Sequence, residues 1–435
     1  MIDLSKFKHQ KFAIFGLGKS GLSTAKALQK AGAIVYLWDD NEVSRVKATE
    51  LGFKLVDLSE LDFLNLDGLI LSPGVPLTHP KPHWTVDKAN AAKIPIIGDV
   101  ELFLQAVKQV DDVTLIAVTG TNGKSTSVSL IYHILKNTGL DVHLGGNIGT
   151  TPVLNMPKAI ANRVYIVELS SYQIDLMPSL QKKGFAPDVA VLINVSPDHI
   201  DRHGTIENYA KIKSQIFAIQ ENNKLAIYGI DDEFGAAFIK KSKTNKPVGI
   251  SAIDKSASYY CKNAMVYQAN KLLFNLQDAR NLQGVHNAQN AAIAYEIAKY
   301  FNIDDDIISQ NMLSFAGLAH RMEYVGKIEL ENGEVLFIND SKATNVEAVK
   351  SALGAFDNIY WLAGGVAKEG GLTSITNVLG KIEKAYLFGD SSQVFASDLI
   401  GVANFEVFST MKAAINKALT EIVQASPDGQ KVILL

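Results

Sequence analysis

The stretch Gly120–Thr126, with the sequence GTNGKST, decides the class of fold. It follows the apolar run Val113–Val118 and leads into Lys124–Asn137, whose apolar spacing is that of an amphipathic helix. A strand, a glycine-rich turn ending in Gly-Lys-Ser, and a helix are the parts of a P-loop, in which backbone amides surround phosphates. In such a loop Lys124 neutralises phosphate charge and the Ser125 hydroxyl meets Mg²⁺.

The spacing of this loop departs from the common pattern, because Val118 stands where the first glycine is usual and Gly120 takes its place. The alternative is a plain glycine turn before a helix with a surface lysine. The strand before the turn and the helix after it favour the phosphate-binding interpretation.

A second glycine loop lies near the N-terminus, at Gly16–Gly21, between an apolar run and a helical segment. Asp39 follows at the end of the next predicted strand, as in the fingerprint of dinucleotide-binding folds. The glycines let the backbone approach a diphosphate, and the helix N-terminus supplies N–H donors. NAD and a UDP-sugar fit the motif equally well, and a plain tight turn is the other interpretation.

Short runs rich in Val, Ile, Leu and aromatic residues predict buried parallel strands. They are Lys11–Phe15, Ile34–Trp38, Gly68–Leu71, Val113–Val118, Tyr165–Val167, Val189–Ile193, Leu225–Tyr228, Val335–Ile338, Ile359–Leu362, Ala385–Phe388 and Val432–Leu435. Helical segments such as Gly21–Lys30, Lys124–Asn137 and Asn287–Tyr300 alternate with them, so we predict an α/β fold. The irregular alternation of residues 254–275 predicts a further β-rich region.

A chain of 435 residues predicts more than one domain. We expect three: a Rossmann-like domain at residues 1–97, a central P-loop domain with a parallel sheet at 98–317, and a Rossmann-like α/β domain at 318–435. The last run, Val432–Leu435, reads as a core strand, so we expect the third domain to be truncated here.

Composition excludes several classes of protein. A net charge of −3 gives no indication of binding to nucleic acid or to a membrane surface. The single cysteine, Cys261, cannot form an internal disulfide, and we expect it to be buried or neutral. No apolar run reaches the roughly 20 residues of a membrane span, so we expect a cytoplasmic protein.

Polar or glycine residues follow many of the predicted strands. They are Gly16, Asp39, Ser72, Gly120, Glu168, Asn194, Asn339, Gly364 and Gly389. Ligands of open α/β sheets bind beyond the carboxyl ends of the strands, so the chemistry should lie at these positions.

Some of these candidates also have simpler interpretations. Glu168 suits a Mg²⁺ site that needs few carboxylates. His199 is a less usual ligand and could be an N-cap or a core histidine. Asn287 and Asn290 share a helix face, although Asn287 could simply cap that helix. Arg321 and Lys342 could clamp an anion or simply be solvated, and a further motif, Gly364–Lys368, follows a predicted strand.

Taken in order, these motifs resemble those of the Mur ligase family from about Phe12 to the last residue. The motifs are GLGKSGLS, SPG, GTNGKST, GGNIG, ELSSYQ, NVSPDHIDRH, HNAQN, HR and NDSKATN. ELSSYQ and DHIDRH resemble the D-glutamate-adding member more than the members that add alanine, diaminopimelate or a dipeptide. Family members continue past Leu435 with a loop that helps to bind glutamate.

The resemblance implies an ATP- and Mg²⁺-dependent ligase of peptidoglycan precursor synthesis, a monomer acting on UDP-N-acetylmuramoyl-L-alanine and D-glutamate. It places ATP on Gly120, Asn122, Gly123, Lys124, Ser125, Thr126, Asn287, Asn290, Arg321 and Asp340. It places the other substrates on Gly16, Gly18, Ser20, Asp39, Ser72, Gly74, Asn147, Ser170, Gln173, Thr344 and Lys368. Metal ligands would be Ser125, Glu168, His199 and a carbamate on Lys213, and catalytic residues Lys124, His199, Lys213 and Lys342.

Three other functions are consistent with parts of the sequence. A folylpolyglutamate synthetase would share the central domain, but such enzymes lack the N-terminal GLGKSGLS domain. An NAD-dependent dehydrogenase would explain the first loop and Asp39, but it has no use for a P-loop. A catalytically silent nucleotide-binding protein is the third.

Overall fold

The computed structural model forms two compact units, Met1–Ile250 and Ser251–Leu435, and each is described here by itself. The structure describes residues 1–149, 151–331, 333–366, 372–425 and 429–435. Among these residues, no helix has both the length and the apolar character needed to cross a bilayer.

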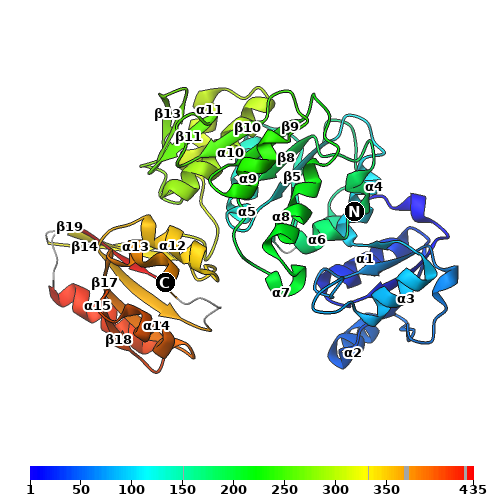
Figure 1. Cartoon of the computed structure of the whole chain (residues 1–435), viewed down its shortest axis with the longest axis horizontal. Helices are drawn as coiled ribbons and strands as arrows, with labels where there is room; N and C mark the ends of the chain where they lie inside the picture. Colours follow the sequence, from blue (N-terminus) through cyan, green and yellow to red (C-terminus); the bar gives the residue numbers. More distant parts are fainter. Residues whose placement is uncertain (150, 332, 367–371, 426–428) are drawn as a thin grey trace. The chain divides into compact units, whose positions relative to one another are not determined.

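The first unit begins with a small parallel sheet of order β2-β1-β3-β4. This part of the chain is drawn in shades of blue in Figure 1. Its strands are β1 (Lys11–Phe15), β2 (Ile34–Trp38), β3 (Gly68–Leu71) and β4 (Ile96–Ile97), and its helices are η1 (Ser5–Phe7), α1 (Lys19–Lys30), α2 (Glu42–Glu50), η2 (Phe63–Asn65) and α3 (Trp84–Ala92). The bounds of the first three strands are as predicted. The prediction that β2 is buried is wrong: it lies at the sheet edge, and Ile34 is 45% exposed.

The same unit holds a second parallel sheet, in the order β10-β9-β8-β5-β7-β6. Its strands are β5 (Thr114–Thr119), β6 (Val142–Gly146), β7 (Val164–Glu168), β8 (Val189–Leu192), β9 (Leu225–Gly229) and β10 (Val248–Ser251). Its helices are α4 (Asp99–Val107), α5 (Lys124–Asn137), η3 (Val153–Asn155), α6 (Ser171–Asp175), η4 (Pro178–Gln181), α7 (Ile200–His203), α8 (Ile206–Ser214), η5 (Gln215–Phe217) and α9 (Glu233–Lys240). The carboxyl ends of β5, β7 and β8 are therefore neighbours, which brings the loops after them together.

The opposite end of this sheet is held by a carboxylate between two ammonium groups. Asp188 precedes β8, and its Oδ2 accepts from the amide of Leu115 at 2.8 Å and from Lys108 Nζ at 2.9 Å. Its Oδ1 accepts from Lys224 Nζ. Burial alone would raise the pKa of Asp188, but Lys108 and these hydrogen bonds hold it below its ordinary value.

We expect Asp188→Ala to destabilise the protein by about 3 kcal/mol, because it leaves two lysines largely buried without their counter-charge. The pKa of Asp188 is depressed in the folded state, so its contribution is present above the unfolded pKa of about 3.9 and is lost as the pH falls below it. Urea unfolding followed by circular dichroism, at neutral and acidic pH, measures both effects. As a control, Lys327→Ala removes two ion pairs at the protein surface and should change stability much less. Equal effects of the two substitutions would contradict the assignment.

The second unit opens with the antiparallel strands β11 (Tyr259–Lys262), β12 (Met265–Gln268) and β13 (Lys271–Asn275), which confirms the β-rich region. The helices α10 (Val285–Tyr300) and α11 (Asp305–Ser314) follow. Cys261 lies on β11 and is fully buried, as expected.

The rest of this unit is a sheet of order β14-β15-β19-β16-β17-β18, drawn from yellow to red in Figure 1. Its strands are β14 (Glu323–Leu330), β15 (Gly333–Asn339), β16 (Ile359–Gly364), β17 (Ile382–Phe388), β18 (Asn404–Val407) and β19 (Gly429–Leu434), and its helices are α12 (Val346–Gly354), η6 (Thr373–Ile375), α13 (Thr376–Leu379), α14 (Ser392–Leu399) and α15 (Met411–Ala425). Only β14 runs antiparallel to its neighbour. The last strand, β19, lies inside the sheet, as its apolar sequence predicted.

Parallel-rich sheets with helices between their strands confirm the α/β class. The predicted domain boundaries after residues 97 and 317 are not fixed by these observations and stay predictions.

Candidate active site

The P-loop joins β5 to α5 and depends on two of its glycines. Gly123 has a φ of +85°, a conformation that L residues with a side chain rarely adopt. A Cβ on Gly120 would lie 3.0 Å from the Cβ of Ile193, so glycine lets the loop pass close to the end of β8. The loop therefore turns tightly into α5, which begins at Lys124 as predicted.

Asn194, at the end of β8, braces this loop. Its Oδ1 accepts from the amides of Thr121 at 3.0 Å and Asn122 at 2.9 Å. The Thr121 hydroxyl accepts from the amide of Ser196 at 3.0 Å. Asn194 was visible in the sequence only as a polar residue at a strand end, because this bond spans 73 residues.

Two lysines converge on one carbonyl of the loop. Lys124 Nζ donates to the oxygens of Gly120 at 2.9 Å and Thr121 at 2.7 Å. Lys213 Nζ, from the last turn of α8, donates to the same Gly120 oxygen at 2.8 Å. The two residues lie 89 positions apart in sequence, yet the fold brings both amines to the loop that would hold phosphates.

Lys213 is a buried amine, with 1% of its surface exposed. Burial, and then the charge of Lys124, lower its pKa well below the ordinary value, while Asp198 and Glu168 act in the opposite direction. Its Nζ also lies 4.4 Å from the centre of the Tyr209 ring. A lowered pKa increases the share of the neutral, nucleophilic amine.

Glu168 ends β7 and is 2% exposed. The side chain of Asn147 donates to Glu168 Oε1 at 3.0 Å, and the Asn147 amide donates to the Glu168 carbonyl at 2.8 Å. Gly146, with a φ of +95°, allows this approach, because a Cβ there would lie 2.2 Å from the Glu168 carbonyl oxygen. The arrangement holds one carboxylate oxygen of Glu168 in a fixed place.

His199 directly precedes α7 and has a left-handed conformation, with a φ of +55°. It occupies the N-cap position, but its side chain makes no capping hydrogen bond. The core alternative is wrong, because the side chain is 42% exposed. Its ring lies 4.9 Å from that of Tyr172 and its Nε2 lies 3.5 Å from Asp198 Oδ2, so an exposed imidazole remains as a possible metal ligand.

The N-terminal glycine loop is held by two side chains. Ser72 Oγ donates to the Gly16 carbonyl at 2.7 Å, and Asp39 Oδ2 accepts from the Leu17 amide at 2.6 Å. Gly18 is the N-cap of α1, and the Gly74 carbonyl accepts from Arg202 at 2.9 Å. The predicted residues thus lie at one sheet edge, where Asp39 braces the loop.

A cavity of 260 Å³ in the first unit brings together Ser20, Asn147 and Gln173, three predicted substrate-binding residues far apart in sequence. Ser170 forms a capping box with Gln173, which lines the cavity, at the start of α6. Lys19 and Asp99 also line this cavity, and the sequence motifs had not singled either of them out as a ligand.

In the second unit, Asn287 and Asn290 are buried within α10. Asn290 Nδ2 donates to Asn287 Oδ1 at 3.1 Å, and Asn287 Nδ2 donates to the Gln283 carbonyl at 2.9 Å. The capping alternative for Asn287 is wrong, because the N-cap of α10 is Gly284.

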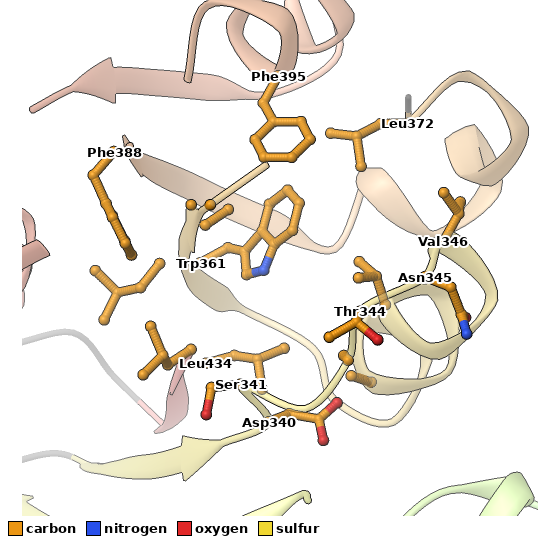
Figure 2. A pocket seen from close by; sticks show the side chains of 18 of the residues that line it. Asp340, Ser341, Thr344, Asn345, Val346, Trp361, Leu372, Phe388, Phe395 and Leu434 are labelled. Carbon is orange, nitrogen blue, oxygen red and sulfur yellow. The ribbon is translucent and has the colours of Figure 1, made fainter. Parts of the chain in front are cut away.

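A cavity of 480 Å³ lies in the second unit at the ends of β15, β16 and β19 (Figure 2). The polar residues Asp340, Ser341, Thr344 and Asn345 line part of it, and most of the other lining side chains, including Trp361, are apolar. Burial raises the pKa of Asp340 to about 6, which a hydrogen bond from the Met322 amide and the charge of Arg321 partly offset. Lys342 is exposed, Arg321 is half-buried, and Lys368 lies outside the described residues.

In the part of the chain that the structure describes, no group of three or more His, Cys, Asp and Glu side chains could hold a metal ion by itself. Mg²⁺ bound with nucleotide needs only one or two carboxylates, because phosphate and water oxygens complete its shell. Glu168, which ends β7, and Ser125, in the first turn of α5, supply the oxygen ligands that this requirement calls for.

Three family models match successive parts of the chain. They are the Mur ligase MurD-like N-terminal domain at residues 10–98, the Mur ligase middle domain at 118–298, and the Mur ligase glutamate ligase domain at 320–435. The chain belongs to the Mur ligase family.

Curated relatives carry a more specific name. The UDP-N-acetylmuramoylalanine–D-glutamate ligases of Rhizobium meliloti and Nitrobacter winogradskyi are 44% and 41% identical to it, each over 100% of this chain and 93% of the relative.

Solved structures of the family share its fold. The UDP-N-acetylmuramate-alanine ligase of Thermotoga maritima matches with a TM-score of 0.57 at 18% identity, covering 98% of this chain and 95% of that one. The MurF ligase of the same organism in complex with ADP matches with a TM-score of 0.57 at 18% identity, covering 85% of this chain and 91% of that one.

Proposed function

We propose that this chain joins D-glutamate to UDP-N-acetylmuramoyl-L-alanine at the expense of ATP, through an acyl phosphate, in peptidoglycan precursor synthesis. One observation carries the proposal: the amines of Lys124 and Lys213 meet at the Gly120 carbonyl of a P-loop. The full-length similarity to D-glutamate ligases supports the choice of substrates.

The P-loop is the ATP subsite in this proposal. The loop residues Gly120, Asn122, Gly123 and Thr126 lie around the phosphates, and Lys124 contacts the β- and γ-phosphates. Ser125 and Glu168 would hold one Mg²⁺, and His199 would hold a second. Bound Mg²⁺ would neutralise charge on the transferred phosphoryl group.

Lys213 is assigned a carbamate. Its neutral amine adds to CO₂, which forms an N–C bond and releases one proton, and the product is an anionic oxygen ligand beside a cation. The burial of Lys213 favours this assignment, because the neutral amine is the form that reacts.

The UDP-linked substrate is assigned to the rest of the first unit. Gly16, Gly18, Ser20, Ser72 and Gly74 would lie along the diphosphate. Asp39 would approach the uracil, while Asn147, Ser170 and Gln173 would contact the muramoyl-alanine end. The 260 Å³ cavity beside Ser20 supports the last assignment.

Residues of the second unit are assigned to the remaining parts of the substrates. Asn287 and Asn290 would meet the adenine, Asp340 the ribose and Arg321 the phosphates. Lys342, Thr344 and Lys368 would seat the incoming amino acid. The position of Asp340 and Thr344 on a common cavity supports these roles.

The reaction balances in two steps. An oxygen of the L-alanyl carboxylate attacks the γ-phosphorus of ATP, and ADP leaves. The amine of D-glutamate then attacks the acyl carbon, phosphate leaves with the carboxylate oxygen, and the amine loses a proton. Lys124 stabilises the phosphoryl charge in the first step, so catalysis rests on positioning and electrostatics.

We place the domain boundaries after residues 97 and 317, as the sequence predicts. We further propose a monomeric enzyme that acts in the cytoplasm, which its single thiol and small-molecule substrates favour.

Phosphate release from ATP, with each substrate omitted in turn, tests the proposal against the alternatives. We expect release that requires both UDP-N-acetylmuramoyl-L-alanine and D-glutamate. Release with a folate acceptor instead would favour a folylpolyglutamate synthetase, and nicotinamide reduction would favour a dehydrogenase. No release under any condition would indicate a silent nucleotide-binding protein.

A further inference from the structure

Asp99 is a buried acid on the wall of the 260 Å³ cavity. It is the first residue of α4 and is 6% exposed. Its Oδ1 accepts from the Val100 amide at 2.9 Å, and its Oδ2 accepts from Ser20 Oγ at 2.6 Å. The acid therefore fixes where the hydroxyl hydrogen of Ser20 points.

This hydrogen bond conflicts with the role proposed for Ser20. A hydroxyl has a single hydrogen, and here the Asp99 carboxylate receives it. Ser20 would then turn only lone pairs toward a diphosphate, whose oxygens are also acceptors. Ser20 can donate to a phosphate only if another group donates to Ser20.

The charges around the cavity also disfavour an anionic substrate while Asp99 is ionised. Among the described residues that line the cavity, Lys19 and Asp99 are the only ionisable ones, and Asn147 and Gln173 are neutral. Lys19 is exposed, and its Nζ lies 3.5 Å from the Gly149 carbonyl. On α4 itself, Glu101 is buried and adds another acid. An anionic substrate would meet the negative charge of Asp99 at close range.

We propose that Asp99 is a positioning residue that takes up one proton when the UDP-linked substrate binds. The Asp99 hydroxyl then donates to Ser20 Oγ, and Ser20 turns its hydrogen to a phosphate oxygen. The proton comes from a solvent donor, whose bond to that proton breaks as an O–H bond forms on Asp99. The inference rests on the proposed function, because it assumes that the diphosphate lies at Ser20.

The surroundings of Asp99 favour this protonation. Burial raises the pKa of Asp99, and the hydrogen bonds from Ser20 and Val100 offset this only in part. A phosphate charge nearby would raise it further, because like charges disfavour the ionised form. A diphosphate joined to a ribose and a sugar carries no proton that titrates near neutral pH, so the pH dependence of binding reports on the protein.

The proposal is tested by titration calorimetry, which measures the affinity for UDP-N-acetylmuramoyl-L-alanine at a series of pH values from mildly acidic to alkaline. For the wild-type chain we expect the affinity to fall by up to tenfold for each unit that the pH rises, in the range where Asp99 is ionised in the substrate-free protein. Titration in two buffers of different ionisation enthalpy should show uptake of about one proton per substrate in that range. Asp99→Asn, whose amide always donates to Ser20, should bind independently of pH and at least as tightly as the wild type at alkaline pH.

Two further variants separate this role from a structural one. Ser20→Ala should bind more weakly and without this pH dependence, and adding Asp99→Asn to it should change little. Glu101→Gln makes the same chemical change on the same helix and should keep the wild-type pH profile. The proposal is overturned if wild-type affinity is flat with pH and no proton is taken up, or if Asp99→Asn binds as weakly as Ser20→Ala. Absence of wild-type binding at every pH would overturn the proposed function as well.

Discussion

Replacing Lys124 with alanine should lower the turnover number by about a thousandfold or more while leaving the fold intact. The lysine amine lies within the P-loop, 2.9 Å from the Gly120 carbonyl, and is assigned the phosphates of ATP. Without it, charge that develops on the transferred phosphoryl group is not neutralised. The fold should persist because Lys213 still donates to the Gly120 oxygen.

The measurement is steady-state ligation, with circular dichroism and thermal melting as checks on folding. Lys136→Ala is the matched control, since this lysine lies exposed in the last turn of the same helix. It should retain wild-type turnover. Near-normal activity of Lys124→Ala would refute the assignment of the loop to ATP.

Lys213→Ala should also lose nearly all activity, but small carboxylates such as acetate should restore part of it. The substitution removes the amine that would carry the carbamate and leaves space in a buried site. A free carboxylate can enter that space and supply the same anionic oxygens. Activity is measured against increasing acetate concentration at fixed ATP and Mg²⁺.

Specific rescue distinguishes this role from general activation by salt. Acetate should not restore Lys124→Ala, because that variant lacks a cation and not a carboxylate. Chloride at equal ionic strength should restore neither variant. A Lys213→Ala protein that is fully active without acetate would discredit the carbamate.

Much of the sheet architecture was predictable from local sequence. The runs that became β1, β2 and β3 are short, apolar and followed by glycine or polar residues, and their bounds are as predicted. Several other strands were missed. β6 contains two glycines and a histidine, β4 has only two residues, and β14 at a sheet edge alternates polar with apolar residues.

The parts of the site whose functional residues are consecutive in the sequence could be predicted. The P-loop depends on a turn and a helix start, so its glycines and Lys124 could be read directly. The bracing of that loop by Asn194 and the bond between Ser20 and Asp99 join residues more than 70 positions apart. Only the fold brings such pairs together, and no local pattern in the sequence marks them.

The central claim is that ATP activates the L-alanyl carboxylate as an acyl phosphate. Its most direct test is a single ligation with substrate whose two alanyl carboxylate oxygens are both ¹⁸O. Mass spectrometry should find one ¹⁸O in the released phosphate and the other in the new amide. Phosphate that carries no ¹⁸O, formed together with the amide product, would contradict the account.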